Sequence, residues 1–151
     1  RQLQYSDRGT LMQSTEGMVT LQERMVNLVK QLNMPVLESS LVIGKWVNRL
    51  KIGLVQHTSE LPLRLAEPWP LSVEPVESET SFDLDKALSL VDRDRMDILD
   101  TLIRVTIEEV DLNLAEALGM MRSWEHLVRG QLSQAAGPGQ LFSPTEIPDD
   151  F

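Results

Sequence analysis

The clearest pattern in the chain is a set of apolar side chains that recur at steps of three and four residues, as they do in amphipathic helices. One such stretch begins near Thr15 and ends at Pro35, because proline lacks an amide hydrogen and restricts the residue before it. Residues 1–13 show no clear period, and we expect an irregular lead-in there. The apolar stripe of this first helix consists of Met18, Leu21, Met25, Leu28 and Leu32, widened by Val26 and Val29.

A second apolar stretch predicts a helix that begins near Ser39 or Ser40, since either hydroxyl can accept a hydrogen bond from an unpaired amide of the first turn. The stretch is so rich in β-branched residues that a strand over residues 41–47 is the competing interpretation. Its apolar positions are Leu41, Val42, Trp46, Val47, Leu50, Leu54 and Val55.

Residues 60–80 contain four prolines and five glutamates, which predicts an extended, polyproline-like linker. Such a segment is long for a loop within a compact domain. Trp69 stands between Pro68 and Pro70, which keep it out of any helix. The linker therefore either wraps along the helices or presents Trp69 to a partner, and the sequence leaves both possibilities open.

The second half of the chain is helical by the same criterion. We expect a short helix up to about Val91, followed by the strongest periodicity of the chain from Asp94 to Gly119. Aspartates in the first turns of this long helix suit the positive end of a helix dipole. Gly119 either bends the helix or ends it, which leaves residues 120–134 as a last helix before Gly137 and its neighbours stop regular structure.

These patterns predict an all-α fold, a helical bundle of four to five helices with a proline-rich extended crossing segment and irregular tails. We expect the helices of the second half to pack on those of the first half as one domain. The expected divisions are an irregular lead-in at 1–13, an N-terminal helical pair at 14–59, a Pro/Glu-rich linker at 60–80, C-terminal helices at 81–135 and an extended acidic-aromatic tail at 136–151.

Cysteine and histidine, two residue types that often carry catalysis or bind metals, are sparse. The chain has no cysteine, and its two histidines, His57 and His126, fall in different predicted helices. It contains neither a serine nucleophile motif nor a glycine-rich phosphate loop. We therefore expect no metal, no cofactor and no enzymatic activity. The alternative is an enzyme with a carboxylate-lined pocket, built from Glu108, Glu109, Asp111 and Glu116 on one predicted helix.

The net charge of −9 is unevenly distributed. Residues 1–60 carry seven basic and five acidic side chains, whereas residues 61–151 carry seven basic and eighteen acidic ones. Such an acidic body repels phosphate and disfavours nucleic acid as a partner. Lys45 and Arg49, with Lys51 nearby, form a small basic patch. The patch either pairs with carboxylates of the second half or, in an alternative function, lets an oligomeric regulator contact nucleic acid.

The remaining functional candidates are apolar side chains outside the helices. Three of them lie among acidic residues of the tail, a composition typical of short interaction motifs. Together with the basic patch they complete the set of predicted partner-binding residues, which are Trp69, Phe142, Ile147, Phe151, Lys45 and Arg49.

No apolar run approaches the ~20 residues that a membrane-spanning helix needs, so we expect a soluble chain. The helical faces are broad enough to suggest self-association or a protein partner. The sequence therefore favours a non-catalytic protein-interaction subunit, such as an adaptor, an assembly factor or a chaperone-like component of a larger complex.

Overall fold

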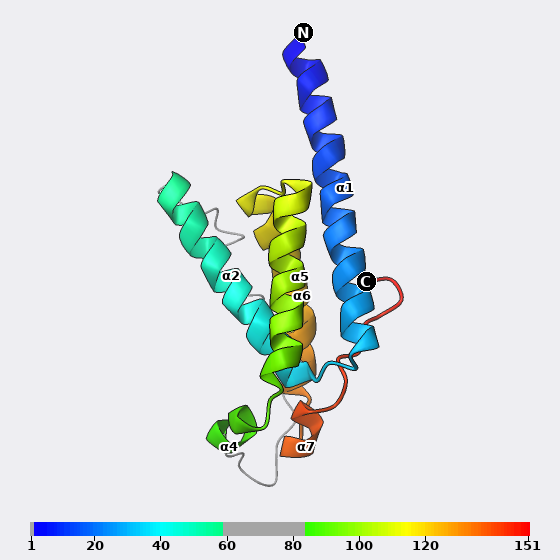
Figure 1. Ribbon diagram of the computed structural model, residues 1–151, viewed down its shortest axis with the longest axis vertical. Helices are drawn as coiled ribbons and strands as arrows, with labels where there is room; N and C mark the ends of the chain where they lie inside the picture. The colour runs from blue at the N-terminus through cyan, green and yellow to red at the C-terminus, as the bar shows by residue number, and fades with distance from the viewer. Residues whose placement is uncertain (1, 59–83) are drawn as a thin grey trace.

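The computed structural model (Figure 1) describes the backbone of residues 2–58 and 84–151, and the side chains of 16–56, 85–137 and 139–151. Within these residues the chain is all-α and contains no strand, which confirms the predicted helical bundle. The helices are α1 (Gln2–Gln31), α2 (Val36–Thr58), α4 (Leu84–Ser89), α5 (Arg93–Val110), α6 (Leu114–Ser133) and α7 (Pro138–Leu141).

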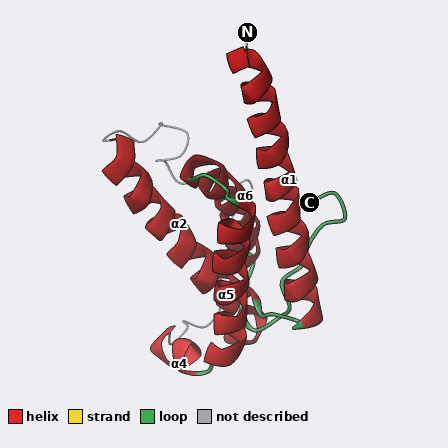
Figure 2. Ribbon diagram, turned by 45° about the horizontal axis from the view of Figure 1, so that its top comes forward, coloured by secondary structure: helices red, strands yellow, loops and turns green. Residues whose placement is uncertain are grey.

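The four long helices pack in two main pairs, with α1 along α5 and α2 along α6. Helices α5 and α6 lie between the other two (Figures 1 and 2). Helices α1 and α5 run antiparallel, since Gly17 of α1 lies against Val110 of α5 and the later Arg24 bonds the earlier Thr106. A Cβ atom at Gly17 would lie 3.1 Å from Val110 Cγ2, so the missing side chain allows the two helices to approach closely. The helices of the first half therefore pack on those of the second half, as the sequence predicts.

Apolar side chains from all four long helices form the core between them. Their burial accounts for the three–four spacing in the sequence, because residues at these steps share one side of a helix. The largest fully buried core side chains are Leu21, Met25, Val29, Met34, Ile43, Leu99, Ile103, Leu118, Met121, Trp124 and Val128.

The expected irregular lead-in at 1–13 is wrong, because α1 begins at Gln2. A helix of 30 residues is about 45 Å long at 1.5 Å per residue, and its first half extends beyond the other helices in Figure 1. Apolar periodicity reports burial against neighbouring elements, and this part of α1 has few neighbours among the described helices. The sequence pattern is therefore weak there although the backbone is helical.

Helix α2 begins at Val36, one turn earlier than the two serines suggested. The carbonyl of Pro35 accepts the amide hydrogen of Ser39 at 3.0 Å, so the first helical turn is already closed there. The Ser39 hydroxyl is buried and contacts Thr145 instead of capping the helix. The alternative strand over residues 41–47 is also wrong, because the β-branched side chains there face the core from a helix.

The single long helix expected from Asp94 to Gly119 is two helices. Asp111 ends α5 in the left-handed conformation at φ 53°, and its amide donates back to the helix. Asn113 then caps α6, since its side chain accepts the Glu116 amide hydrogen at 2.9 Å. Gly119 lies inside α6 and breaks nothing. The chain can change direction at Asp111 because Asn and Asp adopt the left-handed conformation more readily than most residues.

The tail at 136–151 is only partly extended. Residues 138–141 form the short helix α7, which the sequence did not predict, and Leu141 is buried in a small apolar cluster with Leu37, Ala87 and Ala135. We call residues 143–151 the docked segment. They return to the bundle and bring the end of the described chain beside α1 in both Figures 1 and 2.

Candidate functional site

The docked segment begins with main-chain pairing to the junction between α1 and α2. Val36 donates its amide hydrogen to the Ser143 carbonyl at 2.9 Å, and Thr145 donates to the Met34 carbonyl at 2.8 Å. These bonds form an isolated antiparallel bridge between Pro35 and Pro144. The pairing has the geometry of a strand added to an edge, although neither partner belongs to a sheet.

A buried hydroxyl fixes the position of the segment along this junction. Thr145 is buried, and its hydroxyl donates to the Met34 carbonyl at 2.9 Å. The Ser39 hydroxyl lies 2.8 Å from the same Thr145 oxygen and can donate to it. An apolar side chain of the same shape at position 145 would deprive the buried Ser39 hydroxyl of this partner. Because the loss of a buried hydrogen bond costs free energy, the site favours threonine here.

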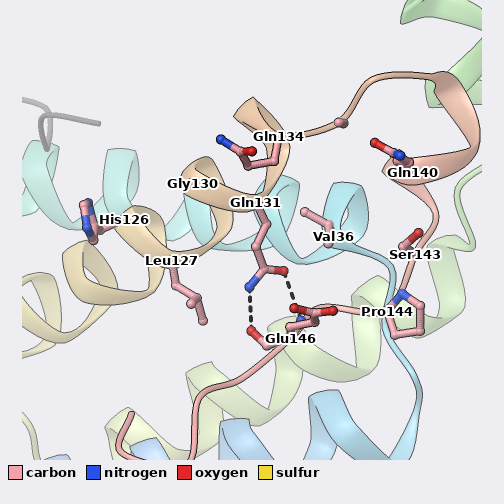
Figure 3. A pocket seen from close by; sticks show the side chains of 11 residues that line it. Val36, His126, Leu127, Gly130, Gln131, Gln134, Gln140, Ser143, Pro144 and Glu146 are labelled. Atoms are coloured by element: carbon pink, nitrogen blue, oxygen red, sulfur yellow. Dashed lines mark hydrogen bonds between the residues drawn. The ribbon is translucent and has the colours of Figure 1, made fainter. Parts of the chain in front are cut away.

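The Gln131 side chain of α6 binds Glu146 through the Glu146 backbone alone. The Gln131 amide donates to the Glu146 carbonyl, and its oxygen accepts the Glu146 amide hydrogen at 3.0 Å (Figure 3). Gln131 thus makes the pair of bonds that a neighbouring strand would make. The Glu146 side chain itself is exposed and takes no part in these two bonds.

The segment ends on a buried tryptophan. The Phe151 ring meets Trp124 edge to face, with ring centroids 4.9 Å apart and an interplanar angle of 88°. The Trp124 indole N–H donates to Gln22 at 2.7 Å, and Gln22 in turn donates to the Phe151 carbonyl at 3.2 Å. Ile147 packs against the same core. We call Gln22, Met34, Ser39, Trp124 and Gln131 the segment-binding site.

A cleft of about 530 Å³ lies beside the segment-binding site, between α6, the start of α2 and the chain that leaves α7 (Figure 3). Its walls carry amides and aliphatic groups, with His126 and Glu146 as the titratable side chains. No group of three metal-binding side chains occurs among the residues that the structure describes. Its one lining hydroxyl, that of Ser143, lies at the other end of the cleft from His126 (Figure 3).

A second feature is an exposed apolar stripe on α5. Ile98 is 48% exposed and Val105 is 45% exposed, with the half-buried Leu102 between them. These three residues, which we call the α5 stripe, are four and three residues apart and therefore share one side of the helix. Leu102 also packs against the main core, and the adjoining side of α5, about 100° around the helix, supplies the buried Leu99 and Ile103. Helix α5 thus has an apolar side for its own core and, beside it, the exposed Ile98 and Val105.

The structure places five of the six predicted partner-binding residues, in three different surroundings. Lys45 forms an ion pair with Asp100 of α5 at 3.6 Å, which confirms the predicted pairing with a carboxylate of the second half for this one residue of the basic patch. Arg49 lies over the Trp46 ring at 5.1 Å. Phe142 packs against the small cluster that contains Leu141. Ile147 and Phe151 lie in the docked segment, and Trp69 lies outside the described residues.

The carboxylates of the alternative enzymatic site are separated by the helix break at Asp111. Glu108 and Glu109 belong to α5, whereas Glu116 belongs to the first turn of α6. Their predicted alignment along one helix is therefore wrong. Glu109 instead forms a two-point ion pair with Arg24 of α1, at 2.7 and 3.3 Å. The ion pair of Arg24 and Glu109 lies at one end of the α5 stripe, one helical turn beyond Val105.

Arg24 lowers the pKa of Glu109 below its ordinary value of 4.5, first through the hydrogen bond and then through the charge. The lowered pKa means that the pair stabilises the fold above pH 4.5 and that this contribution disappears as the pH falls through the folded-state value. We expect the pKa of Glu109 to return toward 4.5 in an Arg24→Gln variant, as measured by carbon-detected NMR titration. An Arg93→Gln variant, at the other end of α5, is the control and should leave it unchanged. A Glu109 carboxyl that titrates at 4.5 in the wild-type chain would contradict the pairing.

Sequence reasoning missed the residues that hold the docked segment and those of the α5 stripe. Gln22 and Gln131 could not be recognised from the sequence. Each side-chain amide binds a backbone group far along the chain, 129 residues away for Gln22 and 15 for Gln131, and nothing in the local sequence distinguishes it from a surface amide. The α5 stripe could have been found, since Ile98, Leu102 and Val105 follow a second three–four spacing beside that of the core.

None of the helices among the described residues is long and apolar enough to cross a membrane. Comparison with protein-family models, characterised proteins and solved structures found no match.

Proposed function

We propose that the chain is a non-catalytic interaction subunit of a larger assembly, and that the α5 stripe receives an amphipathic helix of another protein. The observation that carries this proposal is the second apolar side of α5. Ile98 and Val105 are about half exposed on a helix whose adjoining side already fills the core. The chain's own packing does not require them to be apolar, whereas a helix-in-groove partner does.

The charge around the stripe favours a basic partner. Asp94, Asp97 and Glu108 are exposed on α5 near the three apolar residues, and Arg104 is the exposed cation on the same stretch of helix. A partner helix with lysines or arginines beside its apolar side would meet these carboxylates at the rim of the contact. Charges at such a rim raise the association rate and select the partner more than they strengthen binding.

Photo-crosslinking tests the proposal directly. Benzoylphenylalanine is placed at Thr101, an exposed position on α5 between Ile98 and Val105, and the chain is expressed in the cells that make it. We expect one dominant crosslinked protein whose crosslinked residues lie on a basic amphipathic helix. With that protein purified, an Ile98→Glu/Val105→Glu variant should bind at least about tenfold more weakly, because both anchors become charged.

A matched control uses the outer side of α2. Ile52 and Val55 are 52% and 46% exposed, so an Ile52→Glu/Val55→Glu variant makes the same change at the same exposure on another helix. All four positions are exposed, and each variant should keep the stability of the wild-type chain within about 1 kcal/mol. Equal binding by both variants would show that the partner does not use the α5 stripe.

A further inference from the structure

Helix α2 lies at an edge of the described bundle and carries a row of exposed residues along its outer side (Figures 1 and 2). The row consists of Lys45, Asn48, Ile52 and Val55, at the steps of three and four residues that keep side chains on one side of a helix. Ile52 is 52% exposed and Val55 is 46% exposed, while other apolar residues of α2 already fill the core. Together with the exposed Arg49, we call these residues the α2 face.

The charge on this side of α2 is positive. Among the side chains of α2 that the structure describes, the charges that reach the surface are Lys45, Arg49 and Lys51, and the one carboxylate, Glu38, is fully buried. Lys45 pairs with Asp100 of α5 at 3.6 Å, yet its side chain remains 53% exposed. In a chain of net charge −9, this helix is a local excess of positive charge that attracts carboxylates of a partner.

Arg49 is held in place within the chain itself. Its guanidinium lies over the Trp46 ring at 5.1 Å, and the Trp46 indole N–H donates to Asp100 at 2.8 Å, which fixes the ring. A guanidinium that is already positioned loses less conformational entropy when it binds, and its planar fork can donate two parallel hydrogen bonds to one carboxylate. Arg49 is therefore suited to an aspartate or glutamate at the rim of an apolar contact.

We propose that the α2 face binds an acidic amphipathic helix of another protein. Ile52 and Val55 receive the apolar side chains of that helix, as in helix-in-groove recognition. Arg49 and Lys51 meet carboxylates on its flanks, as charged residues do beside the seam of two paired helices. The row from Lys45 to Val55 covers about three helical turns, or about 15 Å, which matches one short helix.

This contact goes beyond the one proposed for the α5 stripe. The two surfaces lie on different helices and select partners of opposite charge, so neither contact depends on the other. A chain with both surfaces can hold a basic helix on α5 and an acidic helix on α2 at the same time.

The composition of the α2 face favours a protein helix over a partner that carries phosphate. Nucleic-acid backbones are bound by cations and polar groups, so they give no reason for two exposed apolar residues one turn apart. A helix that lies in a membrane surface has a continuous apolar side, whereas Lys45 and Asn48 interrupt this one. The net charge of −9 repels extended anionic surfaces, but a short helix meets mainly the charges within about 10 Å, where cations prevail.

Binding of two model peptides by the full-length chain tests the proposal. The acidic probe is a labelled helical peptide of about 20 residues, with leucines at steps of three and four and glutamates beside them, and the basic probe has lysines in place of the glutamates. We expect saturable binding of the acidic probe by fluorescence anisotropy, weakened at least about tenfold in Ile52→Glu/Val55→Glu. An Arg49→Gln/Lys51→Gln variant should also weaken it and should flatten its dependence on salt.

The matched control is Ile98→Glu/Val105→Glu, which makes the same change at similar exposure on α5. This variant should bind the acidic probe as tightly as the wild-type chain does. Any binding of the basic probe should be insensitive to Ile52→Glu/Val55→Glu, so that failure of this proposal and failure of the one for α5 are distinguishable. Circular dichroism verifies that each variant is folded.

Three outcomes overturn the proposal. The first is an acidic probe that does not bind at millimolar concentration, or that binds equally well after Ile52→Glu/Val55→Glu. The second is tighter binding of a DNA duplex or of phosphatidylserine vesicles to the α2 face than of the acidic probe. The third is a concentration-dependent dimer of the wild-type chain that Ile52→Glu/Val55→Glu dissociates, which would assign the α2 face to a second copy.

Discussion

A Trp124→Ala variant is expected to lose about 4 kcal/mol of unfolding free energy, which is the largest effect of a single truncation in the core. Trp124 is fully buried, and its ring packs within the core formed by all four long helices. Truncation removes the largest buried side chain and leaves a cavity that a rigid bundle closes only in part. Urea unfolding followed by circular dichroism at 222 nm measures the loss.

The Trp124→Phe variant separates the ring from its hydrogen bond. It keeps most of the buried aromatic surface but leaves Gln22 without the indole N–H that now donates to it at 2.7 Å. We expect this variant to lose about 1.5 kcal/mol, mostly from the missing bond and the smaller ring. A Trp124→Ala variant that loses less than about 1 kcal/mol would contradict the central position assigned to this residue.

The same substitution should loosen the docked segment, because Phe151 rests on the Trp124 ring. The amide hydrogens of Thr145 and Glu146 report on this, since they donate to Met34 and Gln131 in the docked state. We expect both to exchange with solvent faster in Trp124→Ala, by more than the loss of global stability explains. Amides buried in α6 provide the reference for global opening.

Helical periodicity predicts the type of fold here because burial imposes it. Met25 in α1 and Ile103 in α5 stand in runs with three–four spacing, and both are fully buried. The ends of the helices were harder to predict, since they depend on single residues. The reversal at Asp111 rests on one left-handed backbone conformation, and Gly119, the more obvious breaker, lies in mid-helix. A glycine weakens a helix by only about 1 kcal/mol, which tertiary packing easily exceeds.

The segment-binding site could not be predicted, because each of its contacts joins residues far apart in the chain. Ser39 reads as a helix cap in the sequence, yet its hydroxyl contacts Thr145, 106 residues away. The sequence predicts that Phe151 binds a partner, but it does not reveal that the chain's own Trp124 contacts this ring. The tail composition that suggested a motif for another protein suits an intramolecular contact equally well.

An Arg95→Met variant is expected to lose about 3 to 5 kcal/mol, because it strands a buried carboxylate. Glu38, in the first turn of α2, is fully buried and accepts two bonds from Arg95 of α5 at 2.6 and 2.8 Å. It also accepts the amide hydrogen of Asp92, the residue that caps α5, at 3.2 Å. The hydrogen bonds to Glu38 are the main reason that the pKa of Arg95 is raised. The pair thus fastens the start of α2 to the start of α5.

Substitution of the other partner, Glu38→Met, should lower the unfolding free energy by less, about 1 to 2 kcal/mol. The two partners differ in exposure, since the Arg95 side chain is 29% exposed and can turn its guanidinium to water, whereas Glu38 cannot reach water. The double variant Glu38→Met/Arg95→Met removes both charges and should recover most of the loss seen in Arg95→Met. Urea unfolding of all four proteins completes the cycle. If Glu38→Met proves more destabilising than Arg95→Met, the main cost is the lost hydrogen bond between Glu38 and the Asp92 amide. The unpaired buried charge is then not the dominant contribution.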